Sequence, residues 1–262
     1  MTPQLAQFLE LAPLGFLVGA YGTLVGAGGG SVLVPLLLFL MPDRDPAAVT
    51  AISLAVVFFN AYSGTVAYMR MGRVNYRLGI LFTLASLPGA ILGTLLVHRI
   101  PSGLFNLLFG VLLVSVGGLL VVNPLGSRRS TDGHTPPPPR ADLIGAVGSA
   151  YIAVLSSLLG IGGGIIHVPF LIRTLRMEPH FATATSHFVL TFMALTATTT
   201  HVLMGQLDNA LTETMFLAVG VMMGAPLGAA LSTRLKGSFI IRTLAMALCL
   251  VGFRLLWRSF GF

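Results

Sequence analysis

The sequence predicts an all-α integral membrane protein made of two homologous halves. Of its 262 residues, 55% are hydrophobic and only 9% are charged, whereas soluble domains carry roughly 25% charged residues. Apolar stretches of about 20 residues, the length of a membrane-spanning helix, fill most of the chain. The second half of the sequence also repeats the pattern of the first, which indicates that the two halves are homologous.

Eight apolar segments follow one another along the chain. Four lie in the first half, at 13–40, 48–69, 77–98 and 103–122, and four in the second, at 143–173, 182–203, 211–232 and 238–258. Residues 123–142 between them hold four consecutive prolines and scattered charges, a composition typical of a connector. We therefore expect an N-terminal membrane repeat over 1–122, a Pro-rich linker over 123–142 and a C-terminal membrane repeat over 143–262.

The repeat is clearest at two glycine-rich motifs. LVGAGGGSVLVP at 24–35 and LLGIGGGIIHVP at 158–169 are identical at seven of twelve positions. Further pairs follow in the same order and at nearly constant spacing: Asp45-Pro46 with Glu178-Pro179, Met71-Gly72 with Met204-Gly205, and Gly89-Ala90 with Gly224-Ala225. Such an ordered series indicates a duplicated unit.

The basic residues indicate how the segments cross the membrane. If all eight segments span, the 15 Lys and Arg divide almost evenly between the two sides. If 13–40 and 143–173 instead enter and return at their glycines, 11 lie on the linker side and 4 on the other, namely Arg44, Arg99, Arg254 and Arg258. The positive-inside rule favours this second arrangement. Each half then has three spans and one re-entrant segment, which makes the halves inverted repeats with a cytoplasmic linker and both termini outside.

Each glycine motif predicts a break in a helix. Glycine lets the backbone turn sharply and approach a ligand closely. The second half of a broken helix begins with unpaired N–H groups, whose partial positive charge suits an anion. No Lys-Ser/Thr pair follows the glycines, which argues against a nucleotide-binding loop. Close helix packing is the alternative role of such glycines.

The doubled motif resembles that of a known family. Two copies of Gly-x-Gly-Gly-Gly-x4-Pro, in two four-segment halves, are similar to the sulfite exporter TauE/SafE family. The matching positions are Gly26, Gly28, Gly29, Gly30 and Pro35, then Gly160, Gly162, Gly163, Gly164 and Pro169. The resemblance covers nearly the whole chain. It implies transport of sulfite, organosulfonates or related anions across the bacterial cytoplasmic membrane, and leaves the individual substrate open.

Polar side chains near the motifs are the candidate ligands. All eight acids lie at segment ends or in loops, so no carboxylate relay or metal site is expected. We expect the anion at the midplane between the two breaks, where its candidate contacts are Gly28, Gly29, Gly30, Ser31, Ser53, Asn60, Gly162, Gly163, Gly164, Thr183, Ser186 and His187. The hydroxyls could instead bond to their own helices. His167, His187 and His201 are candidate proton carriers, or else structural histidines.

These observations favour a secondary transporter, most simply an exporter. No ATPase motif is present, and an anion leaving the cell gains about 2.3 kcal/mol per charge at 100 mV, inside negative. No hydrolase motif indicates an enzyme, and no cofactor or nucleic-acid partner is expected. The expected partners are a small anion and the lipid bilayer of the cell membrane. The alternative is a membrane-embedded enzyme or sulfur-relay component, for which the single cysteine, Cys249, is the best candidate. The sequence indicates neither the coupling ion nor the oligomeric state.

Overall fold

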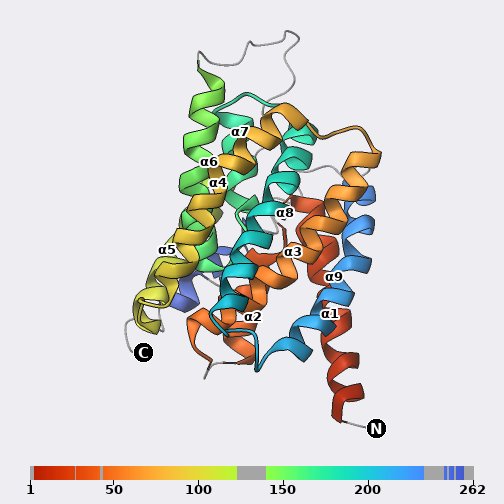
Figure 1. The fold of residues 1–262 in the computed structure, drawn as a ribbon, viewed down its shortest axis with the longest axis vertical. Coiled ribbons are helices and arrows are strands. Elements are labelled where there is room, and N and C mark those ends of the chain that lie inside the picture. The colour runs from red at the N-terminus through yellow and green to blue at the C-terminus, as the bar shows by residue number, and fades with distance from the viewer. Residues whose placement is uncertain are drawn as a thin grey trace.

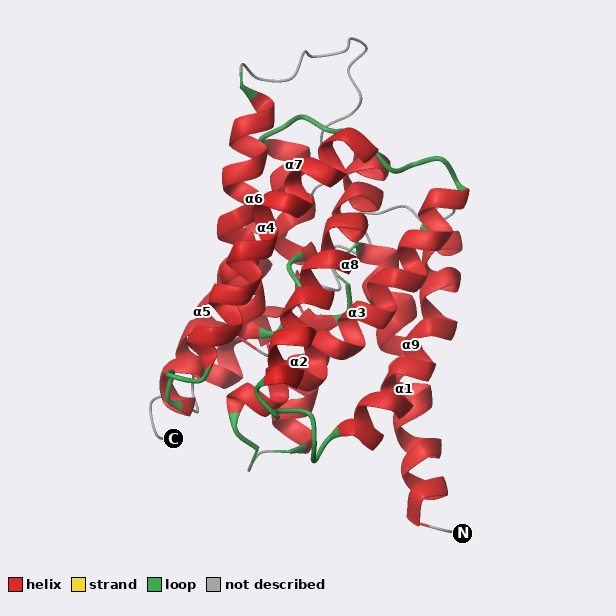
Figure 2. Ribbon diagram, in the orientation of Figure 1, coloured by secondary structure: helices red, strands yellow, loops and turns green. Residues whose placement is uncertain are grey.

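The computed structural model describes residues 3–26, 28–41, 44–122, 140–232, 245–246, 248–250 and 252–256. Within these residues every regular element is a helix (Figure 2). The elements are α1 (Pro3–Val25), α2 (Gly30–Leu40), α3 (Pro46–Arg70), α4 (Tyr76–Val97), α5 (Ser102–Val122), α6 (Ala141–Leu159), α7 (Gly164–Arg173), α8 (Pro179–Leu203) and α9 (Leu211–Leu231). Most of the predicted linker, and much of the segment predicted at 238–258, lie outside the described residues.

Seven of the described helices are long and apolar enough to cross a membrane. The two exceptions are α2 and α7, with 11 and 10 residues. At roughly 1.5 Å per residue, each is about 15 Å long, half the thickness of a bilayer core. The prediction of an all-α membrane protein is therefore confirmed. The segments predicted at 13–40 and 143–173 each contain a long helix, a break and a short helix.

Matching residues set the boundaries of matching helices. Pro46 and Pro179 open α3 and α8 directly after Asp45 and Glu178, as expected for proline, whose fixed φ and missing N–H suit the first turn. Beyond the other ends of these helices stand Gly72 and Gly205, with φ of 67° and 70°. The acid-proline and Met-Gly pairs that recur in the sequence thus mark matching helix ends in the two halves.

Helices of the two halves pack closely against each other. The most extensive packing in the molecule joins α1 to α9 and α4 to α6, so the first helix of each half lies against the fourth helix of the other. Glycines make this close approach possible: Gly220, Gly224 and Gly228 on α9 lie directly against the backbone of α1, and Gly89 and Gly93 on α4 against that of α6. These two helix pairs enclose α3 and α8, which pack against each other in the centre.

The first helices of the two halves begin at opposite ends of the molecule. Figure 1 shows α1 beginning at the lower end of the molecule and α6 at the upper end. The short helix α2 lies in the lower half of that view and α7 in the upper half. The glycine breaks that precede α2 and α7 are thereby brought to the middle, against α3 and α8.

Candidate functional site

The two breaks have nearly the same backbone conformation. Three glycines in each have positive φ: 80°, 71° and 83° at Gly26, Gly28 and Gly29, and 70°, 73° and 86° at Gly160, Gly162 and Gly163. Residues with a side chain rarely adopt these angles. The glycines at these positions are therefore required by the turn itself, before any ligand is considered.

Each break ends as the N-terminus of a short helix. Gly29 and Gly163 are the N-caps of α2 and α7, and neither helix has a side chain bonded at its cap. The amides of Leu33 and His167 donate to the carbonyls of Gly29 and Gly163 at 2.9 and 2.8 Å. The amides of Val32 and Ile166 donate to the same carbonyls, at 3.1 and 3.0 Å. The first two amides of each helix, at Gly30 and Ser31 in α2 and at Gly164 and Ile165 in α7, have no partner within their helix. Both breaks thus present N–H groups and the positive end of a helix dipole.

The breaks lie against each other. A Cβ on Gly30 would come within 2.7 Å of the carbonyl carbon and oxygen of Ile161 in the second break. A Cβ on Gly28 would overlap Leu190 of α8, and one on Gly162 would lie 2.5 Å from Cγ1 of Val57 on α3. Val57 and Leu190 occupy equivalent positions in the two repeats. The close-packing role of the glycines is therefore present at the same positions as the predicted anion contacts.

The predicted hydroxyls contact the breaks in different ways. Ser53 on α3 donates a hydrogen bond of 2.7 Å to the carbonyl of Gly160. The methyl group of Thr183 lies 2.8 Å from where a Cβ on Gly26 would stand. The proton of Ser53 is thus already engaged, and in this arrangement Ser53 holds the second break in place. Direct contact of Ser53 or Thr183 with an anion stays a prediction.

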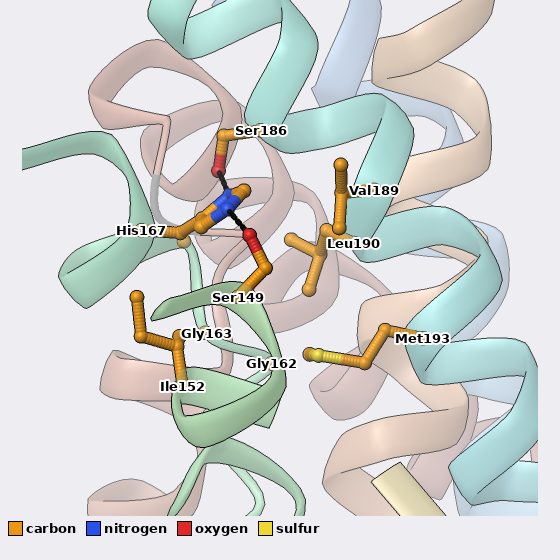
Figure 3. Close-up of a pocket in the computed structure, with 10 residues that line it drawn as sticks. Ser149, Ile152, Gly162, Gly163, His167, Ser186, Val189, Leu190 and Met193 are labelled. Atoms are coloured by element: carbon orange, nitrogen blue, oxygen red, sulfur yellow. Dashed lines mark hydrogen bonds between the residues drawn. The ribbon is translucent and has the colours of Figure 1, made fainter. Parts of the chain in front are cut away.

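A histidine between two serines stands beside the second break. His167 on α7 is buried, with Nε2 2.9 Å from Oγ of Ser149 on α6 and Nδ1 3.2 Å from Oγ of Ser186 on α8 (Figure 3). Ser149 was not among the sequence candidates. Its counterpart in the first repeat is Gly15, so no repeated polar pair marks this position in the sequence.

This trio lines a small buried cavity. Its other lining residues are Gly162, Gly163 and Gly164 of the second break and the apolar side chains of Ile152, Val189, Leu190 and Met193. The free space is about 10 Å³, room for about one water molecule. Figure 3 shows the side chains of Leu190 and Met193 extending from α8 toward the cavity. An oxyanion fits here only if the walls move apart.

An asparagine stands beside the first break. Asn60 on α3 is buried, and its Oδ1 accepts a hydrogen bond of 3.1 Å from Oγ1 of Thr23. Its Nδ2 has no partner among the described residues and lies 3.6 Å from the point where a Cβ on Gly29 would stand. The sequence singled out Asn60 but not Thr23, which belongs to the long helix before the break.

Several buried polar groups around the breaks lack hydrogen-bond partners among the described residues. They are the hydroxyls of Ser31 and Ser156 and the amide nitrogen of Asn60. Ser31 follows Gly30 directly, and Oγ of Ser156 lies 2.9 Å from where a Cβ on Gly163 would stand. Buried polar groups are nearly always bonded, and an exception calls for a water or ion. All three can donate, which suits a ligand made of acceptors.

The other two candidate histidines stand apart from this cavity. His187 is fully buried on α8, its ring edge-on to Tyr68 at 5.3 Å, and neither ring nitrogen has a partner of good geometry among the described residues. His201 lies at the end of α8, with its ring 5.6 Å from that of His98. Of the three predicted proton carriers, only His167 lines the cavity.

Cys249, on which the enzyme alternative rests, lies against Gly117 of α5 and is not among the residues that line the cavity. Among the described residues, no group of three or more His, Cys, Asp or Glu is arranged to hold a metal ion.

The fold and the site together define a polytopic membrane protein of the transporter class, in which broken helices carry backbone donors to a buried centre. The family follows from sequence comparison. The profile described as Sulfite exporter TauE/SafE matches residues 11–255, and the chain belongs to this family.

Curated relatives agree with this assignment over nearly the full length. The chain is 29% identical to the "Probable membrane transporter protein YunE" of Bacillus subtilis, with 96% of this chain and 98% of that one aligned. It is 31% identical to a "Probable membrane transporter protein" of Xylella fastidiosa, with 94% of each chain aligned. A third relative, MJ0441 of Methanocaldococcus jannaschii, is 32% identical over 63% of each chain. No solved structure matches the fold.

Proposed function

We propose that the protein is a secondary transporter that exports small sulfur-containing anions, such as sulfite or organosulfonates, and binds them between the two glycine breaks. One observation carries the proposal: buried donors on Ser31, Asn60 and Ser156, which have no partner within the described part of the chain, lie around the N-termini of α2 and α7. Aligned N–H groups and dipoles favour negative charge at such a point. Neither break contains an Asp or Glu, which would repel an anion.

The proposed membrane arrangement is an inverted repeat with two re-entrant segments. Three observations support it: the opposite directions of α1 and α6 (Figure 1), the short length of α2 and α7, and the 11-to-4 distribution of basic residues. In this arrangement the upper end in Figure 1, where α6 begins, faces the cytoplasm. The breaks then lie near the midplane, where transporters of this plan bind their substrates.

Transport in this proposal requires the breaks to separate and close. The cavity holds about one water molecule as it stands, so the structure corresponds to a closed form. Separation would expose the amides at the start of α2 and α7 together with the hydroxyls of Ser31 and Ser156. His167 is the proposed proton carrier, because Ser149 and Ser186 contact its two ring nitrogens and can relay a proton. The membrane potential alone suffices for export of an anion, by about 2.3 kcal/mol per charge at 100 mV.

A binding screen on the purified protein tests the proposal. Sulfite, sulfate, thiosulfate and a short alkanesulfonate are compared by thermal shift, with chloride and phosphate at matched ionic strength as controls. A ligand at 100 times its Kd adds about 2.7 kcal/mol to the stability of the folded state, so the melting temperature should rise for the sulfur anions. Stabilisation by phosphate alone, or by none of the anions, would contradict the proposed substrate class.

A further inference from the structure

We infer that the cavity beside His167 is reached from the end of the molecule at which α6 begins, through a basic vestibule, and that Phe82 is the seal between vestibule and cavity. The nature of the cargo rests on the proposed function. The route itself rests on two hollows and on the side chains that separate them.

The vestibule is a hollow of about 320 Å³ at the start of α4 and α6. It is lined by Asn75, Arg77, Leu78, Ala141, Asp142, Leu175, Arg176 and Met177. Its described lining carries two arginines and one aspartate, a composition that favours anions over cations. Its volume accommodates a small anion together with part of its hydration shell, in contrast to the cavity at the breaks.

An ion pair between the two halves crosses the vestibule. Nη2 of Arg77 lies 2.8 Å from Oδ2 of Asp142, and both side chains are well exposed. Exposed pairs of this kind contribute little to stability and open readily. We therefore expect the ion pair to close the vestibule only weakly. The apolar residues beneath it form the main barrier to an anion.

A small apolar cluster separates the vestibule from the cavity. Its buried members are Phe82, Leu171, Leu175, Ala182 and Val189. Leu175 also lines the vestibule, and Val189 also lines the cavity. The same cluster is thus a wall of both hollows.

Phe82 is the largest side chain of this cluster and faces the functional histidine. Its ring is fully buried and stands edge-on to His167, with 6.2 Å between the ring centroids. On its other side the ring fills a notch at Gly145 of α6, where any Cβ would overlap it. A rotation of this single ring would therefore change the wall between vestibule and cavity.

The repeat counterpart of Phe82 lies in a larger apolar cluster. Leu217 on α9 is fully buried there, and among the described residues this cluster has 26 buried members, against five in the cluster around Phe82. We therefore expect truncation of Leu217 to open no path to the cavity, because many more apolar side chains surround it.

Accessibility of a cysteine placed in the cavity tests the route. Ile152→Cys in a Cys249→Ala background is the reporter, because Ile152 lines the cavity. Arg140→Cys in the same background identifies the vestibule face, because Arg140 precedes α6. Membrane-impermeant methanethiosulfonate reagents are applied to intact cells and to inside-out vesicles.

We expect Phe82→Ala to raise the labelling rate of the reporter by about tenfold or more, because truncating a buried ring opens space in the seal. The increase should occur only from the face that labels Arg140→Cys. The matched variant Leu217→Ala should leave the rate unchanged. An unchanged rate in Phe82→Ala, or an equal rise in Leu217→Ala, would overturn the inference. Phe82→Leu serves if the alanine variant does not fold, as judged by size-exclusion chromatography, and should give a smaller rise.

The charge of the vestibule is tested with the same reporter in the Phe82→Ala background. Arg77→Gln should lower the ratio of labelling by an anionic reagent to labelling by a cationic one, and Asp142→Asn should raise it, each by several-fold. Equal ratios in both variants would contradict the anion route. Labelling requires neither binding nor transport, so a failed anion screen would remove the proposed cargo and leave the route standing.

Discussion

The two glycine breaks share a backbone and differ in their side chains. Gly28 and Gly29 have φ of 71° and 83°, and Gly162 and Gly163 have 73° and 86°. Yet Leu33 and Gly15 of the first repeat stand where His167 and Ser149 stand in the second. In turn, Met193 of the second repeat stands where the first has Asn60. The backbone is therefore the element common to both halves, and the side chains provide a protonatable face at one break and an amide face at the other.

The largest expected effect comes from breaking the shared backbone. Gly163→Val should abolish anion binding, because valine strongly disfavours a φ of 86° and its Cβ would lie 2.9 Å from Oγ of Ser156. Gly29→Val should do the same in the first half, where a Cβ would lie 3.0 Å from Val18. The measurement is isothermal titration of sulfite into purified protein.

Gly72→Val is the matched control for these variants. Gly72 also has positive φ, at 67°, but a Cβ there would meet nothing within 4 Å. It therefore carries the conformational strain without the crowding, and should bind sulfite normally with somewhat reduced stability. If Gly163→Val and Gly72→Val behave alike, crowding at the break is not what matters. If the milder Gly163→Ala binds normally while Gly163→Val aggregates, the glycines serve only packing.

The next effect tests the difference between the halves at the histidine. His167→Gln should flatten the pH dependence of transport in proteoliposomes and leave binding within about threefold, because glutamine can still bond to a serine but cannot carry a proton. His187→Gln is the control, since His187 lies against Tyr68 and outside the cavity. An unchanged pH profile in His167→Gln would assign this residue to structure.

The backbone of the site could be predicted from the sequence because it depends on local chemistry. The glycine motifs predict the two breaks, and the acid-proline pairs predict the starts of α3 and α8. Both signals depend only on a few neighbouring residues. The short α2 and α7 follow from the apolar length that remains after each break. The partners of His167 and Asn60 could not be predicted, because Ser149 and Thr23 lie on other helices of the same half, and the sequence does not show which faces of those helices pack together. The repeat marks positions that both halves share, whereas the polar side chains at the two breaks lie mostly where the halves differ.

A smaller effect follows from exchanging the residues that differ. Asn60→Met copies the second repeat into the first, and removes the unpartnered amide donor beside Gly29. Loss of one hydrogen bond to a charged ligand corresponds to about 1.5–3 kcal/mol, so sulfite affinity should fall by roughly tenfold to a hundredfold. Leu54→Met, a change of similar size one turn and a half earlier on α3, should have little effect on affinity. Equal affinities in the wild type and Asn60→Met would remove the amide from the site.

The smallest effect separates two serines that the repeat makes equivalent. Ser53 donates to the carbonyl of Gly160 and so supports the break of the other half, whereas Ser186 contacts His167. Ser53→Ala leaves a buried carbonyl unpaired and should lower the free energy of unfolding by about 1–3 kcal/mol, measured by denaturant or thermal unfolding, with the pH profile of transport unchanged. Ser186→Ala removes one partner of the imidazole and should shift the pH profile with a stability loss of about 1 kcal/mol or less. Ser63→Ala removes a hydroxyl on α3 that donates to the carbonyl of Met222 on α9, and so controls for the loss of a serine–carbonyl bond away from the breaks. If Ser53→Ala moved the pH profile as far as Ser186→Ala does, the two breaks would share one proton path, and the division between an amide face and a protonatable face would be wrong.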